Sequence, residues 1–211
     1  NDAFPFMGVR HGQANEVPVR VLRISFSGEL AYEAYIPAGH GEALWQMLFD
    51  EGQELDLVTY GSEALGALRI EKGHVAGPEL DGRTTLADLG LDRMASKNKS
   101  FVGNTLMGRE GLTDTDRPRL VGLEPSDPRA KLAAGAILCL PGHHEGHGLG
   151  VVTSTTYSPE LGKNIGIGLL SGGLSREGEL IDAVFPLRGE VTAVRIRSPH
   201  FVDPEGTRLH A

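Results

Sequence analysis

The first part of the chain alternates apolar and polar residues with the period of two that is typical of β-strands. The alternation runs through residues 7–36 and is clearest from Val17 onward. Gly12 and Asn15 lie between the first two apolar runs and mark a hairpin. These residues therefore predict an antiparallel sheet.

Two helical patterns follow this sheet. Residues 42–49 carry apolar side chains at helical spacing, and Gly52 follows them. A second helix is predicted for residues 62–72, with Ser62 as its N-cap and Gly73 as the residue that ends it. Strands followed by helices indicate an α+β fold, with an antiparallel sheet and the helices packed on one face.

Residues 77–111 contain only short helical patterns. One opens at Thr84 or Thr85, and another follows Gly103. The polar, proline-containing stretch 113–118 is typical of a domain boundary. We therefore expect a first region covering residues 1–112.

The remainder of the chain is rich in short β-type runs separated by turn residues. No long helix is predicted after Gly111. Residues 117–211 should therefore form a small all-β domain, a barrel or sandwich, of which we favour the barrel. The runs are 119–123, 136–140, 150–155, 165–170, 179–185 and 190–197.

The composition of the chain argues against a membrane protein and against a nucleic-acid-binding protein. The chain has 211 residues, 40% of them hydrophobic and 23% charged, with a formal net charge of −8. Its apolar runs are too short to span a bilayer, and its basic residues form no stripe that could follow nucleic acid. The single cysteine, Cys139, lies in an apolar run and suits a reducing cytoplasm. We expect a cytoplasmic protein that binds neither membrane nor nucleic acid.

The beginning of the chain is unlike a natural start. Residues 1–7 contain no initiator methionine at position 1, no basic region and no apolar signal core. We therefore expect the chain to be part of a longer protein.

Two sequence patterns suggest sites that their context does not support. His143, His144 and His147 have the wrong spacing for a zinc helix, and the neighbouring glycines and proline favour an exposed hairpin loop. The glycine-rich pieces at 146–150 and 171–173 lack the strand and helix of a dinucleotide site. We predict no metal site.

The segment RISFSGELAYE, residues 23–33, is a stronger candidate for a site. Its Ser-Gly break lets the backbone approach another group closely. Glu29 and Glu33 are four residues apart and would share a side if the strand were regular. Arg69 lies within the second predicted helix. The alternative to a binding site is an internal ion pair between Glu33 and Arg69 that holds helix to sheet.

This segment, together with LRIEKG at residues 68–73 and KSFVG at residues 99–103, resembles the glycine-cleavage T-protein (aminomethyltransferase) family. The resemblance implies a folate-binding domain followed by a β-barrel. It also implies that Glu33 contacts the pterin of tetrahydrofolate, that Arg69 lines the same site, and that Arg208 contributes from the carboxyl terminus. Phe26 stands where many members have tyrosine. The catalytic aspartate of the family lies in a preceding half-domain, so no catalytic residue is expected here.

Further motifs, including SPHFVDPEG near the end, resemble the carboxyl-terminal part of the α subunits of heterotetrameric sarcosine oxidases. This resemblance implies transfer of a one-carbon unit from oxidised sarcosine to tetrahydrofolate, with other subunits as partners. NAD, FAD and FMN would belong to the parent complex and not to this chain. The alternatives are an aminomethyltransferase or dimethylglycine dehydrogenase domain, or a folate-binding or subunit-interface module without chemistry of its own.

Overall fold

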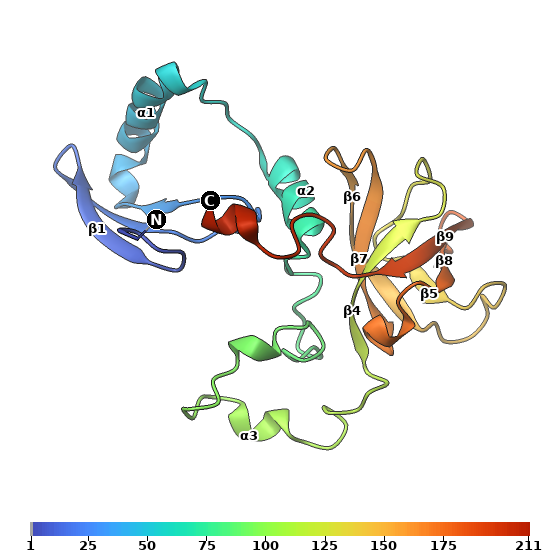
Figure 1. The fold of residues 1–211 in the computed structure, drawn as a ribbon. Helices are drawn as coiled ribbons and strands as arrows, with labels where there is room; N and C mark the ends of the chain where they lie inside the picture. Colours follow the sequence, from blue (N-terminus) through green and yellow to red (C-terminus); the bar gives the residue numbers. More distant parts are fainter. Residues whose placement is uncertain (1) are drawn as a thin grey trace. The chain divides into compact units, whose positions relative to one another are not determined.

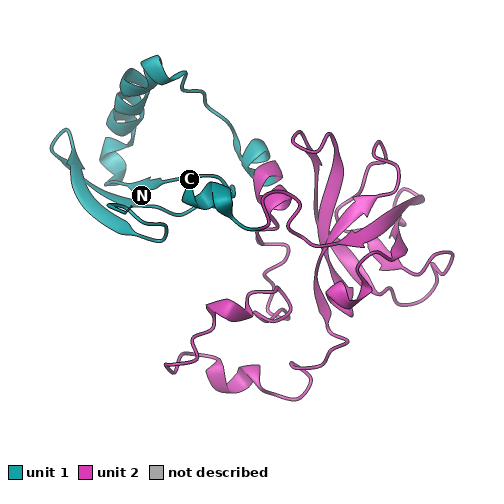
Figure 2. Cartoon of the chain, in the orientation of Figure 1, with its two compact units in different colours: residues 1–66, 205–211 teal, residues 67–204 magenta. Residues whose placement is uncertain are grey.

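The computed structural model describes residues 2–211. The chain divides into two compact units, one formed by residues up to 66 together with 205–211, and one formed by residues 67–204 (Figure 2). The division falls inside helix α2 (Ser62–Lys72). Each unit is described by itself.

The first unit is built on a three-stranded antiparallel sheet, with strand order β1-β2-β3. The strands are β1 (Val9–Ala14), β2 (Val17–Leu22) and β3 (Glu33–Tyr35). Asn15 and Glu16 join the first two strands and both have positive φ angles, 47° and 70°. Two such residues form the turn whose twist matches a hairpin. The predicted antiparallel sheet is confirmed.

Helix α1 (Gly41–Gly52) lies on one side of this sheet, close to the turn between β1 and β2 (Figure 1). Its Leu44 and Met47 line a small cavity of about 80 Å³ together with Val17 of β2 and Ile36. Short 3₁₀ turns lie on either side of it, η1 (Ala38–His40) and η2 (Gln53–Leu55), and η5 (Thr207–His210) is near the carboxyl terminus. A helix on one face of an antiparallel sheet is the predicted arrangement.

Helix α2 has the predicted bounds, but Ser62 is its first helical residue and not its N-cap, because the carbonyl of Gly61 accepts the first helical hydrogen bond, from the amide of Leu65 at 3.1 Å. Gly73 follows it at φ 77°. The amide of Gly73 donates to the carbonyl of Ile70, and the amide of His74 donates to that of Arg69, at 3.1 and 2.8 Å. These two bonds form a Schellman motif, which requires the left-handed conformation that glycine adopts without strain.

The segment between α2 and the barrel is mostly turns. It contains η3 (Asp92–Met94) and the four-residue α3 (Asn104–Met107). The short helix predicted after Gly103 is confirmed, whereas the helix predicted at Thr84 or Thr85 is wrong. There the Asp88 carboxylate binds the Thr85 amide, and Gly90 turns the chain at φ 71° before a helix can extend.

Six antiparallel strands close into a barrel in the order β4-β7-β6-β5-β8-β9. The all-β barrel predicted for this region is confirmed, and a short 3₁₀ turn, η4 (Gly173–Arg176), follows β7. The strands are β4 (Pro118–Pro125), β5 (Ile137–Cys139), β6 (Gly150–Ser158), β7 (Lys163–Ser171), β8 (Leu180–Phe185) and β9 (Glu190–Arg197).

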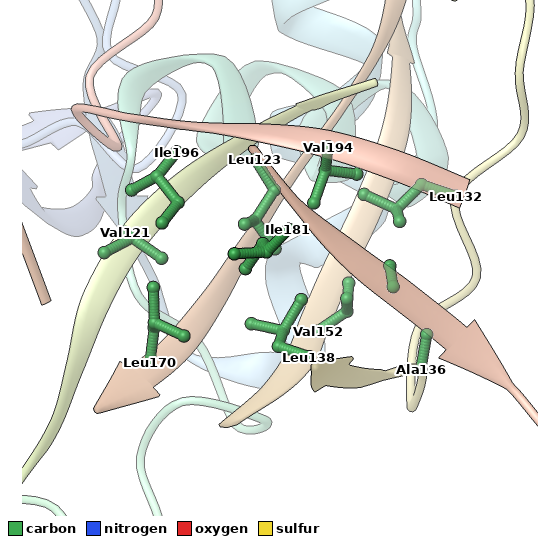
Figure 3. Packing of buried hydrophobic residues seen from close by; sticks show 11 residues of the cluster. Val121, Leu123, Leu132, Ala136, Leu138, Val152, Leu170, Ile181, Val194 and Ile196 are labelled. Atoms are coloured by element: carbon green, nitrogen blue, oxygen red, sulfur yellow. The ribbon is translucent and has the colours of Figure 1, made fainter. Parts of the chain in front are cut away.

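Apolar side chains fill the barrel (Figure 3). Leu123, Leu138 and Ile196 are among those with no exposed surface. Strand β7 is buried on both sides, since Leu170 joins this core while Ile165, Ile167 and Leu169 join a second cluster with Ile70 of α2. All the buried apolar side chains of residues 2–211 lie between Ile70 and Ile196.

Candidate functional site

The segment RISFSGELAYE forms a hydrogen-bonded loop between β2 and β3. Ser25 Oγ accepts the amide of Gly28 at 3.0 Å, and Ser27 Oγ accepts the amide of Glu29 at 3.3 Å. Gly28 has a φ of 88°, which suits glycine. Because the loop is not a strand, the regular alternation expected to place Glu29 and Glu33 on one side does not hold here.

Arg23 anchors the beginning of this loop. It is 1% exposed, and its guanidinium donates to the carbonyls of Phe4 at 2.7 Å and of Ala211 at 3.2 Å. A buried guanidinium needs such acceptors because its charge has left water. Arg23 therefore ties the loop to both ends of the first unit.

Arg208 also reaches this loop. Its Nη1 lies 2.9 Å from a carboxylate oxygen of Glu29, and both side chains are about two-fifths exposed. Arg208 and Glu33 are both predicted site residues. The structure thus places Arg208 at the loop that leads to Glu33.

Glu33 begins β3 and is partly buried. Its carboxylate accepts a hydrogen bond from the hydroxyl of Tyr35. This hydrogen bond, with the negative charge of Glu33, raises the pKa of Tyr35 above its ordinary value. Ala34 shares a face with Ile36, which lies beside α1, so alternation places Glu33 and Tyr35 on the opposite face of the sheet.

Arg69 belongs to the second unit, where it joins a buried polar network. Its Nη1 donates to Glu79 at 3.1 Å, and its Nη2 donates to Ser154 of β6 at 2.6 Å. Ser154 in turn donates to the other carboxylate oxygen of Glu79 at 2.7 Å. The side chains of Arg69 and Glu79 are 9% and 0% exposed. The carboxylate that pairs with Arg69 is therefore Glu79.

The other charged residues of LRIEKG are also buried. Glu71 accepts a hydrogen bond from Ser158 at the end of β6, at 2.5 Å. Lys72 lies 2.9 Å from a carboxylate oxygen of Asp203. Each charged side chain of this motif thus has a partner in the barrel or in the segments next to it, which fixes the end of α2 within the second unit.

The sequence did not indicate several of these partners. Glu79 follows a Gly-Pro turn and no local pattern marks it as buried. The same holds for Asp88, which is 1% exposed and pairs with Arg117 at 2.6 Å. Burial acts to raise the pKa of Asp88, but hydrogen bonds from Arg117 and Thr85 outweigh it and hold this pKa below its ordinary value.

The histidine-rich loop lies between β5 and β6 and is exposed. His144 Nε2 is 2.7 Å from Asp182, and this hydrogen bond lowers the pKa of Asp182 despite some burial. Within residues 2–211, no group of three or more metal-ligating side chains is placed to hold an ion. Nor does any described helix have the length and apolar character needed to cross a bilayer.

The described residues form a small antiparallel sheet with a helix beside it, an LRIEKG helix whose charged side chains are buried, and a closed six-stranded barrel. Together these elements define a two-part α+β and β-barrel protein. Residues 1–99 match the model of the GCVT N-terminal domain, and residues 119–203 match that of the glycine cleavage T-protein C-terminal barrel domain. The chain therefore belongs to the glycine-cleavage T-protein family, as its motifs predict.

Individual relatives agree with this assignment. The sarcosine oxidase subunit alpha of Rhizobium meliloti is 41% identical over 99% of this chain and 22% of its own length. An aminomethyltransferase of Desulfitobacterium hafniense is 28% identical over 93% of this chain and 52% of its own length. The crystal structure of glycine cleavage system aminomethyltransferase T from Bartonella henselae superposes with a TM-score of 0.79 at 25% identity, covering 97% of this chain and 54% of that one. This chain thus spans about a fifth of the first relative and about half of the other two.

Proposed function

We propose that this chain is the folate-binding part of a larger protein that transfers a one-carbon unit to tetrahydrofolate. The observation that carries the proposal is the match of both T-protein domains in order along one chain. Tetrahydrofolate, when bound, supplies the nitrogens that accept the one-carbon unit. The residues of this chain bind and orient it.

Glu33 has the properties that a pterin requires. A pterin edge presents an amino group beside a ring N–H, and one carboxylate can accept both hydrogen bonds in parallel. The carboxylate of Glu33 is partly buried, lies on the face of the sheet away from α1, and already accepts a hydrogen bond from Tyr35. Partial shelter strengthens such charge-assisted bonds.

Arg208 and Arg69 have supporting roles in this proposal. Arg208 holds Glu29 and thereby the loop that leads to Glu33. Arg69 is the third predicted folate contact, and its Nη1 and Nη2 donate to Glu79 and Ser154. We propose that this network orients its guanidinium toward the ligand.

The parent protein that the relatives favour is a sarcosine oxidase α subunit. We infer that a flavin elsewhere in the complex oxidises sarcosine and that this region passes the one-carbon unit to tetrahydrofolate, leaving glycine. NAD, FAD and FMN would then bind outside this chain, other subunits would be its partners, and the protein would be cytoplasmic. The catalytic aspartate would lie outside residues 1–211.

The domain boundary is part of the same proposal. We place the folate region at residues 1–112 and the barrel at 117–211. Tyr32, Trp45 and Leu48 of the first unit are each about half exposed. Such large apolar surfaces favour a unit that packs against further protein, in accord with a half-domain.

The second candidate is a folate-binding or subunit-interface module without chemistry of its own. The buried ion pair between Arg69 and Glu79 inside the second unit favours this candidate. Such a pair would also be expected if the LRIEKG motif had only a structural role. An aminomethyltransferase or dimethylglycine dehydrogenase domain remains the enzyme alternative.

Glu33→Ala in the full-length protein tests the proposal. We expect it to weaken binding of a reduced folate at least tenfold, measured by isothermal titration, while flavin-dependent oxidation of sarcosine continues and releases formaldehyde. Glu42→Ala, which removes an exposed carboxylate in the first turn of α1, is the matched control. Unchanged folate affinity in Glu33→Ala would remove Glu33 from the site. Absence of folate binding in the unaltered protein would overturn the proposal.

A further inference from the structure

Arg119 occupies an unusual position in the barrel. It lies on β4 two residues before Val121 and four before Leu123, both of which belong to the apolar barrel core. Alternation along a strand places all three on the same face. Arg119 is therefore a cation at the end of a row of inward-facing apolar positions.

The guanidinium of Arg119 has an unsatisfied donor. Its Nε is buried, and no described residue accepts a hydrogen bond from it. The ion pairs found among residues 2–211 do not include Arg119. Buried polar atoms in folded proteins nearly always have partners, so the guanidinium of Arg119 retains hydrogen-bonding capacity that no described residue uses.

A glycine fixes the stem of Arg119. A Cβ on Gly173, which has a φ of 53°, would lie 2.7 Å from Cβ of Arg119 and 3.3 Å from its Cδ. Only glycine leaves room for the arginine stem there. Because the stem lies against the backbone, less conformational entropy is lost when the guanidinium binds a ligand.

Arg119 lines a cavity of about 350 Å³ between the start of β4, the turn at η4 and the segment around residue 90. Two carboxylates line it as well. Asp88 is paired with Arg117, whereas Asp92 is exposed at the wall of the cavity. Nearby, Arg176 is paired with Glu179. Thr115 and Ser175 add hydroxyls to the lining.

We propose that this cavity binds a small molecule through a carboxylate group held by the guanidinium of Arg119. A carboxylate matches the two parallel N–H groups of a guanidinium and carries a single charge. Phosphate is disfavoured because its greater negative charge would be repelled more strongly by Asp92. The volume suits a small ligand, since ligand pockets begin at about 300 Å³. The proposal does not depend on folate binding.

The test follows the ¹⁵N-labelled Nε–H resonance of Arg119 in the full chain during titration with acetate and, separately, with inorganic phosphate. We expect a saturable shift with acetate and weaker binding of phosphate. Arg119→Gln should lower acetate affinity at least tenfold, measured by isothermal titration. Arg119→Lys, which keeps the charge without the two parallel donors, should fall between. Arg188→Gln, which removes an exposed arginine elsewhere on the barrel, is the control.

A second variant keeps the test independent of folding. Asp92 is exposed, so Asp92→Asn should fold normally and should raise phosphate affinity several-fold by removing the repulsion. The proposal is overturned if the unaltered chain gives no saturable shift with acetate, if Arg119→Gln binds acetate as well as the unaltered chain, or if phosphate binds more tightly than acetate. It is equally overturned if Asp92→Asn changes neither affinity.

Discussion

Replacing Glu79 by alanine should strongly destabilise the second unit. The Glu79 carboxylate is fully buried and accepts three hydrogen bonds, from Arg69 at 3.1 Å, from the amide of Ala76 at 2.8 Å and from Ser154 at 2.7 Å. Glu79→Ala removes the acceptor for all three donors. It also leaves the Arg69 charge buried without its counterion.

The size of the effect follows from that uncompensated charge. Removing one partner of a buried ion pair costs about 3–5 kcal/mol, whereas replacing both partners by apolar groups is often close to neutral. We therefore expect Glu79→Ala to lower the free energy of unfolding by about 3–5 kcal/mol. The double variant Arg69→Met, Glu79→Leu should lose less than about 2 kcal/mol.

Urea unfolding measures this difference. The single tryptophan, Trp45, lies in α1 of the first unit, so its fluorescence reports on that unit, while far-ultraviolet circular dichroism also reports on the barrel. We expect the dichroism midpoint to fall and the fluorescence midpoint to move less. Glu63→Ala, at the exposed first turn of α2, is the matched control and should stay within about 0.5 kcal/mol.

Two results would refute the reasoning. A loss below about 1 kcal/mol in Glu79→Ala would show that the network does not stabilise the fold. A double variant as unstable as the single one would show that lost packing, rather than the unpaired charge of Arg69, causes the effect.

Two further predictions concern the segment that precedes the barrel and the barrel itself. The pKa of Asp88 is lowered in the folded state, so its contribution to stability is present above the unfolded pKa of about 4 and is lost as pH falls through the folded value. Asp88→Asn should therefore flatten the decline of unfolding free energy below about pH 5; an unchanged decline would contradict this. In Gly168→Ala, the new Cβ would lie 2.6 Å from the carbonyl oxygen of Val151, and we expect a loss of about 1–3 kcal/mol in urea unfolding. Gly77→Ala, which meets no atom within 4 Å, is its control, and equal stability of the two variants would refute the steric argument.

Elements with local signals could be predicted from the sequence. Helix α2 has its predicted bounds and is followed by Gly73, because helical periodicity and a terminating glycine are local features of the sequence. The six barrel runs were also predictable, since short apolar runs bounded by turn residues need no knowledge of their partners. Closure of the barrel, by contrast, depends on pairs such as β4 with β9, which are far apart in the sequence.

The candidate site was predictable only in part. The residues LRIEKG identify the end of a helix, but the sequence does not show that Arg69, Glu71 and Lys72 are all buried. Their partners include Ser154 and Asp203, more than 80 residues away. Long-range polar pairing leaves no periodic trace in the chain, so it could not be predicted. At Thr85, the reciprocal hydrogen bonds with Asp88 are those of a helix start, but Gly90 turns the chain at φ 71° within the next turn, so no helix extends.

The burial of Arg69 decides how its role can be tested. A substitution at Arg69 removes the donor to Glu79 and Ser154 whether or not the guanidinium also contacts folate, so lost folate binding alone would not identify a contact. Ser154→Ala separates the two roles, because it removes the hydrogen bonds of Ser154 with Arg69 at 2.6 Å and with Glu79 at 2.7 Å but leaves the ion pair between Arg69 and Glu79. If this network holds Arg69 in the orientation that contacts folate, Ser154→Ala should reduce the free energy of folate binding by more than it reduces the free energy of unfolding. Equal reductions in the two free energies, or a reduction in the free energy of unfolding alone, would show that the network only stabilises the second unit. Glu33 would then be the proposed folate contact that remains.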